Sequence, residues 1–340
     1  MISRLRLAVN GRSSLGFPPF QGKDPPLIDA LRALYDDQDH AKLRFTRPSK
    51  FVFLCGGVIT PNTPPRTLRD YLYRTKHLSA YVNADIVLAE TARDLYRSTK
   101  YRDLISFEED IARIASLVIV IPESPGSLAE LGAFATNEII RQALCVIVQE
   151  RFASDESFIR LGPIEHIIQT QGRDFVGVYP WRIDSSRVLS RSMSPHYDEL
   201  VDFINVHLDR LPASTGFNRI QELQIFYIIY WVTNMLVAVS SSVLKGCVSF
   251  LLPDAQPDDI SNKIYSLMIA GWLRKYSYSR KDYYYATVDA DPFNYSYRAG
   301  IRERDSLRRK SDIREGMKAV DQVPPYVLGK AAGDRRPSAK

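Results

Sequence analysis

The stretch SFEEDIARIASLVIVIPESPGSLAELGAFATN, Ser106–Asn137, sets the architecture that the sequence predicts. Its centre, Leu117–Ile121, is a continuous aliphatic run, which is typical of a strand buried on both faces of a parallel sheet. Pro122–Ser127 then predicts a tight loop, and helical spacing resumes at Leu128. Ligands of open α/β sheets bind just beyond the carboxyl ends of the strands. We therefore expect this loop and Glu130 to lie at a binding site.

Four further apolar runs have the length of buried strands: Lys50–Cys55, Asp85–Ala89, Leu144–Gln149 and Phe175–Tyr179. Helical spacing predicts helices over Leu27–Tyr35, Arg66–Leu78 and Leu104–Ile114, the last opened by a capping box at Ser106–Glu109. Strands that alternate with helices predict an α/β fold, with a doubly wound parallel sheet over residues 50–180.

The character of the sequence changes after residue 218. Three helices are predicted over Ile220–Val239, over Ser242–Leu252 and from Pro257 onward, followed by a hairpin made of Leu273–Tyr278 and Tyr283–Val288. This order predicts a smaller winged-helix domain, whose third helix and hairpin usually meet a duplex. Five basic residues would contact phosphates there: Lys263, Arg274, Lys275, Arg280 and Lys281. Because Asp258 and Asp259 oppose DNA binding, a winged helix used for protein contacts remains an alternative.

The chain therefore divides into an N-terminal extension (1–45), the α/β domain (46–180), a helical connector (181–218), the winged helix (219–300) and a basic tail (301–340). The net charge of +6 comes from 45 Lys and Arg against 39 Asp and Glu. The tail alone carries 11 basic and 6 acidic residues. We expect it either to be solvated or to make an electrostatic contact with nucleic acid.

Cysteine usage and apolar runs indicate the compartment. Cys55, Cys145 and Cys247 lie far apart without metal-ligand spacing, which favours a reducing cytoplasm and predicts neither a disulfide nor a metal site. The N-terminus lacks the apolar core of a signal peptide. Ile225–Val239 approaches spanning length, but polar residues interrupt it, so we expect a buried helix and no membrane contact. The predicted location is cytoplasmic.

Glu130 has two interpretations. In the structural one, Ser127–Glu130 is a capping box and the carboxylate satisfies a backbone amide. In the catalytic one, Glu130 stands at the mouth of the crevice together with Glu90 and Glu108. Such a cluster suits chemistry at an anomeric carbon: one carboxylate attacks C1′ of a ribosyl group and another orients sugar hydroxyls or water.

Backbone groups near Glu130 suit an anionic ligand. Gly56-Gly57 follows a predicted strand and permits close approach of a ligand or of another chain segment, although neither GxGxxG nor a P-loop is present. The amides of the Pro122–Ser127 loop and the next helix N-terminus would bind negative charge.

Three motifs together, FLCGG (Phe53–Gly57), SFEEDIA (from Ser106) and PESPGSLAELGAF (Pro122–Phe134), resemble the effector proteins of type II retron antiphage systems. Those proteins pair a nucleoside deoxyribosyltransferase-like domain with a C-terminal winged helix. The resemblance implies N-glycosidic cleavage of NAD+, with Glu130 as the catalytic carboxylate and NAD+ as substrate rather than cofactor. Glu108 would hold the ribose, although Asp110 also matches the family's acidic position. The pocket would be lined by Gly56, Gly57, Ser124, Gly126 and Ser127.

The resemblance also implies partners. A reverse transcriptase and its multicopy single-stranded DNA and RNA would hold the toxic activity in check until phage infection. The resemblance is also compatible with a higher-order assembly of the protein. Two other functions remain open. The protein could be a deoxyribosyltransferase or DNA-base glycosidase, or it could be a non-enzymatic regulator in which the α/β domain senses a nucleotide and the winged helix binds DNA.

Overall fold

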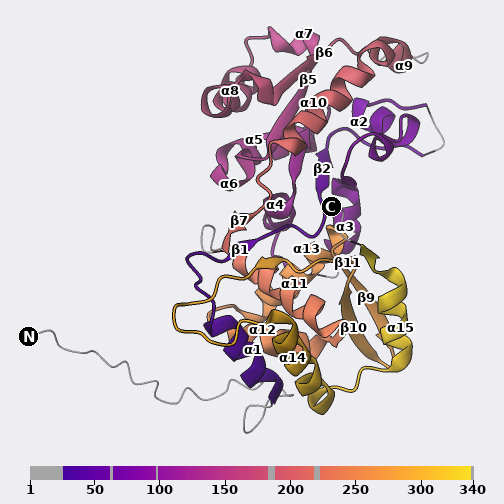
Figure 1. The fold of residues 1–340 in the computed structure, drawn as a ribbon. Coiled ribbons are helices and arrows are strands. Elements are labelled where there is room, and N and C mark those ends of the chain that lie inside the picture. Colours follow the sequence, from indigo (N-terminus) through magenta and orange to yellow (C-terminus); the bar gives the residue numbers. More distant parts are fainter. Residues whose placement is uncertain (1–25, 62–63, 97–98, 183–187, 218–222, 338–340) are drawn as a thin grey trace, which may run out of the picture.

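The computed structural model describes residues 26–61, 64–96, 99–182, 188–217 and 223–337. Its upper part in Figure 1 is built on a five-stranded parallel sheet. In spatial order the strands are β3 (Asp85–Leu88), β2 (Phe51–Cys55), β4 (Leu117–Val120), β5 (Leu144–Gln149) and β6 (Val176–Tyr179). This confirms the α/β class. Because the chain runs outward from β2 in one direction and from β4 in the other, the switch point of the sheet lies between β2 and β4.

Helices cover both faces of this sheet, so the predicted doubly wound arrangement is present (Figure 1). One face packs against α4 (Leu104–Ile114), α5 (Pro125–Thr136), α6 (Glu138–Arg141) and α8 (Glu165–Gln171). The other packs against α2 (Leu68–Asp70), the π-helical turn Tyr71–Thr75 and α10 (Tyr197–Asp209). Shorter helices are α3 (Ala89–Tyr96), α7 (Glu150–Ala153) and α9 (Val188–Met193). All five residues of β2 are buried, as a two-sided strand requires.

The lower part contains the predicted helices and hairpin. The helices are α11 (Gln224–Leu236), α12 (Ser241–Leu251) and α13 (Pro257–Ile269). The antiparallel sheet has the order β8 (Val239–Ser240), β10 (Lys281–Ala286) and β9 (Leu273–Tyr278). Ser279 and Arg280 form the hairpin turn, and both have positive φ, as a two-residue turn between twisted strands requires. The winged-helix assignment itself stays a prediction.

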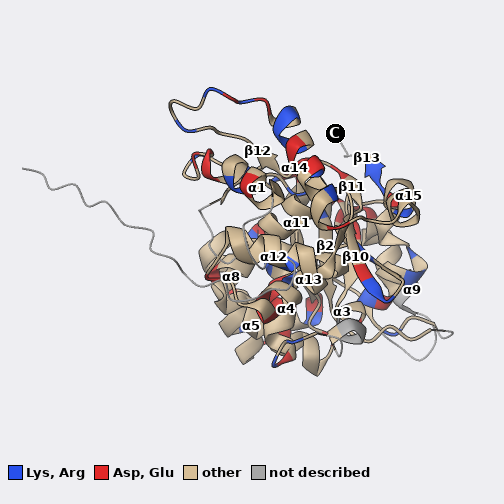
Figure 2. Ribbon diagram, turned by 90° about the horizontal axis from the view of Figure 1, so that it is seen from below, with Lys and Arg blue, Asp and Glu red and all other residues tan. Residues whose placement is uncertain are grey.

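The C-terminal tail is folded, although most of its residues are exposed to solvent. It forms α14 (Ser306–Val320), α15 (Pro325–Asp334) and β13 (Arg336–Pro337), and β13 pairs with β11 (Val288–Asp289). Acidic residues lie beside basic ones along α14 (Figure 2). Arg309 pairs with Asp37 at 2.6 Å, and Arg335 pairs with Asp289 at 2.9 Å. Much of the positive charge of the tail is therefore balanced within the chain.

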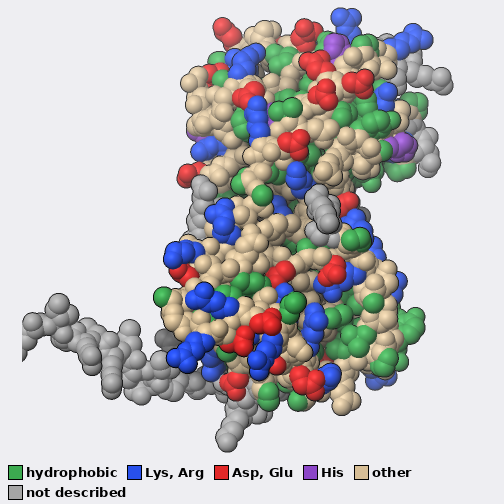
Figure 3. Space-filling model, in the orientation of Figure 1, with side chains coloured by type: hydrophobic (Ala, Val, Ile, Leu, Met, Phe, Trp, Pro, Cys, Tyr) green, Lys and Arg blue, Asp and Glu red, His purple; other side chains and the backbone are tan. Residues whose placement is uncertain are grey.

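Segments far apart in sequence join the two parts. The helix α1 (Pro26–Asp36) packs against α14 within the lower part, so the N-terminal segment reaches β1 from there (Figure 1). A small sheet combines β12 (Phe293–Asn294), β1 (Arg44–Phe45) and β7 (Thr215–Gly216). Figure 3 shows that the molecule narrows between its upper and lower parts. Residues of the N-terminal extension, the connector and the C-terminal region therefore share one junction.

Two further expectations can be compared with the structure. The apolar helix α11 is buried on all sides, and no helix in the described ranges has the length and apolar character needed to span a membrane. The capping box predicted at Ser106–Glu109 is wrong. The helix α4 begins at Leu104 as predicted, but Asp103 caps it by accepting a hydrogen bond from the Ser106 amide at 2.8 Å.

Gly316→Ala should destabilise the protein by about 1–3 kcal/mol, because the added Cβ would lie 2.7 Å from the backbone nitrogen of Leu27 where α14 crosses α1. Urea unfolding followed by circular dichroism measures this loss. The matched control is Gly329→Ala in α15, where a Cβ meets nothing within 4 Å and helix propensity favours alanine. Equal stability of the two variants would contradict the close α1–α14 contact.

Candidate active site

The glycine pair after β2 lies at the switch point and is covered by α2. A Cβ on Gly56 would lie 3.1 Å from the Arg69 side chain, and one on Gly57 would lie 2.3 Å from Thr67 Cγ2. The sequence predicted that this glycine pair permits close approach either of a ligand or of another chain segment. The structure shows the second, because Thr67 and Arg69 lie against the two glycines. The side chains of α2 fill the space directly above these glycines.

The loop after β4 places Glu130 differently from the capping prediction. Ser124, rather than Ser127, is the N-cap of α5, and Ser124 and Ser127 form the capping box reciprocally. Since α5 begins at Pro125, Glu130 lies in the second helical turn, not the first. The structural interpretation of Glu130 as a capping residue is therefore wrong.

The amides expected to bind an anion at this loop have hydrogen-bond partners within the chain. Ser127 Oγ accepts hydrogen bonds from the amides of Glu123 and Ser124, each at 3.0 Å. The Ser127 amide donates to Ser124 Oγ, and Ser124 Oγ donates to the Gly56 carbonyl oxygen. Most of the loop's donors are thus used within the chain. Gly126 is exposed beside them. These hydrogen bonds tie the loop to the start of α5 and to the Gly56 carbonyl oxygen.

Glu123 fixes this loop against α2, a role that the sequence analysis missed. Its carboxylate accepts hydrogen bonds from the amides of Leu68 at 2.6 Å and Arg69 at 3.3 Å, and also from Gly57. These amides belong to the start of α2, where the first helical N–H groups lack intrahelical partners. Burial raises the pKa of Glu123, and the amides oppose that rise. The sequence signal that could have indicated this role is a Glu placed directly between the end of a strand and a Ser-Pro helix cap.

Two of the predicted carboxylates converge on Cys55. This thiol ends β2, is fully buried and donates a hydrogen bond to Glu130. Burial raises the pKa of Cys55 well above its ordinary value, and the nearby charges of Glu130 and Glu108 raise it further. Glu130 is half-buried, with one carboxylate oxygen shielded from solvent, whereas Glu108 is 5% exposed. The structure thus brings Glu108 of α4 and Glu130 of α5, which are 22 positions apart in the sequence, to the same thiol.

Arg69 joins Glu90 to this cluster. Its side chain is 1% exposed, pairs with the carboxylate of Glu90 and lowers the pKa of Cys55. Glu90 does not follow β3 in a loop but lies in the first turn of α3. Arg69 was not predicted as a site residue, because an arginine in a helix usually faces solvent. The buried guanidinium therefore offsets the charge of Glu90, and its charge also lowers the pKa of Glu123.

The structure distinguishes Glu108 from Asp110. Asp110 is 2% exposed, but it accepts hydrogen bonds from Lys263 on α13 and from Tyr101. Only Glu108 contributes to the electrostatic environment of Cys55. Of the two acidic residues that match the family pattern, Glu108 is therefore the one beside Glu130.

A cavity of about 340 Å³ adjoins the loop at the carboxyl ends of β4 and β5. Its lining includes Glu123, Ser124 and Leu128 together with Phe152 and Trp181. Glu130 is not among the residues that line it. A cavity of this size accommodates a small aromatic group beside the rim of the sheet.

Four of the five predicted nucleic-acid contacts are exposed on the hairpin. Arg280 lies in its turn, and Arg274, Lys275 and Lys281 lie on its strands. Lys263 is the exception and the prediction for it is wrong, because its side chain is buried against Asp110 at 2.5 Å. Within the described ranges, no group of three His, Cys, Asp or Glu side chains is placed to hold a metal ion.

Glu123→Gln should lower the free energy of unfolding by about 1–3 kcal/mol, because a neutral amide with one acceptor oxygen cannot replace the carboxylate that binds the start of α2. Chemical denaturation measures the change. Glu156→Gln, at an exposed position of the same domain, removes the same charge and should change little. Equal loss in both variants would show that charge alone matters.

Comparison with known proteins shows which family this chain resembles. Residues 65–275, more than half of the chain, match the family described as STM3845 retron effector protein. One curated relative, "Retron Ec86 putative ribosyltransferase/DNA-binding protein" of Escherichia coli, is 36% identical over 114 residues, which are 33% of this chain and 36% of that protein. Another, "Retron Ec73 putative ribosyltransferase/DNA-binding protein" of Escherichia coli, is 32% identical over 123 residues, or 35% and 38% of the two chains.

The matches span little more than a third of the length of each curated relative. The family match itself covers β3 to β6, the Glu130 loop and the three helices of the lower part. The chain therefore belongs to the STM3845 retron effector family.

Proposed function

We propose that this retron effector cleaves N-glycosidic bonds, with NAD+ as its preferred substrate and Glu130 as the catalytic carboxylate. The observation that carries the proposal is the convergence of Glu130 and Glu108 on the carboxyl end of β2, at the switch point of the sheet. The curated relatives carry ribosyltransferase in their names, which supports chemistry at a ribosyl carbon.

The proposed reaction has two steps. A Glu130 carboxylate oxygen bonds to C1′ while the C1′–N bond breaks, and nicotinamide leaves with that electron pair. Water then attacks C1′, the ester bond to Glu130 breaks, and ADP-ribose and a proton are released. Glu108 holds the ribose hydroxyls, and the 340 Å³ cavity beside the loop accepts the aromatic leaving group.

NAD+ is preferred over neutral nucleosides for a chemical reason. Its pyridinium nitrogen carries a positive charge, so nicotinamide leaves as a neutral molecule without needing a proton. Glu130 is assigned to attack and Glu108 to sugar binding, so neither is left to act as a proton donor. A substrate whose leaving group needs no proton therefore fits this pair of acids best. A deoxyribosyltransferase or DNA-base glycosidase would instead need an acid for its neutral leaving base.

Glu130→Gln should reduce nicotinamide release from NAD+ by about 100-fold or more, because an amide oxygen is a poor nucleophile. Chromatography of the products, with and without the partner DNA, measures the rate. The control is Glu138→Gln, which changes an exposed Glu at the start of the next helix and should leave turnover unchanged.

Thermal unfolding of the same variants tests whether Glu130 acts only through structure. Comparable melting temperatures for Glu130→Gln and wild type are expected, together with lost turnover. Undiminished nicotinamide release by Glu130→Gln would contradict the assignment. Base release from deoxynucleosides or DNA, but not from NAD+, would favour the transferase or glycosidase alternative. Nucleotide-dependent DNA binding without turnover would favour the regulator.

We further propose that the lower part is a winged helix that binds nucleic acid through its hairpin. Arg280 and Lys281 are exposed at the hairpin tip, and the names of both relatives include DNA binding. The helix α13 cannot serve as the recognition helix in this arrangement, because it packs on α4 and its Lys263 pairs with Asp110. The partners would be a retron reverse transcriptase and its multicopy DNA and RNA.

The double variant Arg280→Gln/Lys281→Gln should weaken binding to single-stranded DNA and reduce the slope of log K against log salt by about 0.7 for each lost phosphate contact. Fluorescence anisotropy over a salt series measures both. Arg302→Gln, an exposed charge far along the chain, serves as the control. An unchanged slope in the double variant would place the nucleic-acid contact elsewhere.

A further inference from the structure

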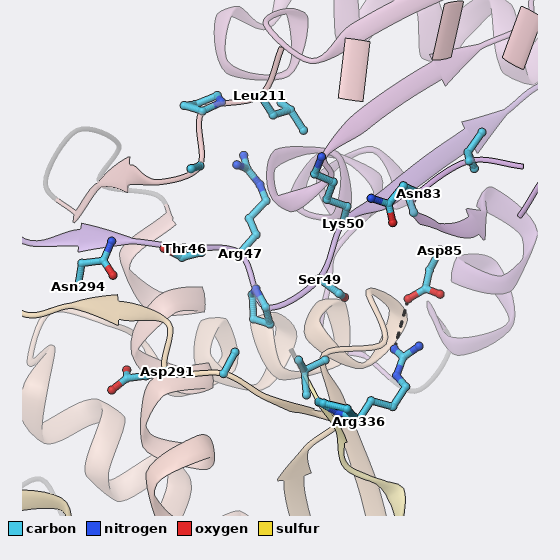
Figure 4. A pocket seen from close by; sticks show the side chains of 18 of the residues that line it. Thr46, Arg47, Ser49, Lys50, Asn83, Asp85, Leu211, Asp291, Asn294 and Arg336 are labelled. Atoms are coloured by element: carbon cyan, nitrogen blue, oxygen red, sulfur yellow. Dashed lines mark hydrogen bonds and ion pairs between the residues drawn. The ribbon is translucent and has the colours of Figure 1, made fainter. Parts of the chain in front are cut away.

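A second and larger cavity, of about 820 Å³, lies at the opposite edge of the sheet, where β2 and β3 begin. Its walls come from the β1–β2 segment, the segment before β3, the end of the connector and the C-terminal region (Figure 4). The Glu130 site lies at the carboxyl ends of the same strands. The two spaces are therefore separated by the length of β2, and this cavity plays no part in the reaction proposed above.

Arg47 is the unusual side chain in this cavity. Burial lowers the pKa of its guanidinium, yet in the part of the chain that the structure describes it forms no hydrogen bond or ion pair. Figure 4 shows that it extends into the cavity toward the segment of Leu211. A partly buried guanidinium without a partner costs stability, so a fold that keeps one needs a reason.

The other charged groups of the cavity leave the region around Arg47 positive. Lys50 runs parallel to Arg47 in Figure 4, and its ammonium donates to the Leu208 carbonyl oxygen at 3.1 Å. Asp209 lies 3.7 Å from that ammonium but is itself largely exposed. The remaining acids are engaged elsewhere: Asp85 pairs with Arg336 at 3.3 Å, and Asp291 pairs with Lys310.

We propose that this cavity binds a nucleoside phosphate, with the phosphate held between Arg47 and Lys50. A guanidinium and an ammonium that line the same cavity match the oxygens of a phosphate. The volume greatly exceeds that of inorganic phosphate and falls within the range of small-molecule sites. Asn83, Asn294 and Thr46 offer amide and hydroxyl groups for a base or sugar, and Val82 and Val288 offer apolar contact.

The position of this site gives the ligand a structural consequence. Arg47 and Lys50 belong to the segment that enters β2, whereas Asn294 and Val288 belong to the lower part of the molecule. A bound nucleotide would therefore contact both parts at their junction. The same phosphate chemistry is offered by a free nucleotide and by the 5′-terminal phosphate of a nucleic acid.

Isothermal titration of the full chain with ADP tests the proposal. ADP should bind wild type and Arg302→Gln alike, and at least tenfold more weakly to Arg47→Gln and Lys50→Gln. Adenosine, which lacks the phosphates, should bind wild type at least tenfold more weakly than ADP. A DNA trinucleotide with and without a 5′-phosphate distinguishes a nucleic-acid terminus from a free nucleotide. If the ligand is a nucleic-acid terminus, the phosphorylated trinucleotide should displace ADP and the unphosphorylated one should not. If the ligand is a free nucleotide, neither trinucleotide should displace ADP.

Two further measurements separate this site from the Glu130 site and from a purely structural role. Glu130→Gln should keep its ADP affinity, and Arg47→Gln should keep its nicotinamide release at saturating NAD+. Because Arg47 forms no hydrogen bond or ion pair in the described chain, Arg47→Gln should not lower the melting temperature, whereas a structural arginine would do so. Full ADP affinity in Arg47→Gln, or no binding of either phosphate source to wild type, would overturn the proposal.

Discussion

The buried ion pair between Asp110 and Lys263 holds the two parts of this protein in one arrangement. Asp110 is 2% exposed and Lys263 is 9% exposed, so neither charge is compensated by water. Tyr101 donates a further hydrogen bond to Asp110, and burial and this carboxylate raise the pKa of the tyrosine. Separating α4 from α13 would leave a buried charge on each side, which makes any other arrangement costly.

This constraint links the candidate active site to the lower part of the molecule. The helix α4 carries Glu108 toward Cys55 and Asp110 toward α13, two residues apart and therefore on different sides of the helix. A change that displaces α13 would therefore also act, through the Asp110–Lys263 ion pair, on the helix that positions Glu108. The pairing also occupies the helix that a winged-helix protein would ordinarily present to a duplex, which leaves the exposed hairpin as the available basic surface.

The order of elements was predictable because it depends on local patterns. The apolar runs that became β2, β4 and β5 were identified with boundaries within one residue, since strands buried on both faces need continuous apolar sequence. The capping residues of α4 and α5 were not predicted correctly, because several Ser, Asp and Glu residues near each helix start satisfy the same motif. Only the backbone geometry selects Asp103 and Ser124 as the caps.

The sequence by itself determined a doubly wound α/β domain, a helical part closed by a hairpin, and a loop that brings Glu130 to the carboxyl edge of the sheet. Only the tertiary structure decided which charges serve within the chain. Lys263 and the basic residues of the tail looked like surface charges, whereas Arg69 and Glu123 looked incidental. The physical reason is that burial and pairing depend on neighbours distant in sequence, and a charged side chain carries no local mark of whether water or a partner will face it.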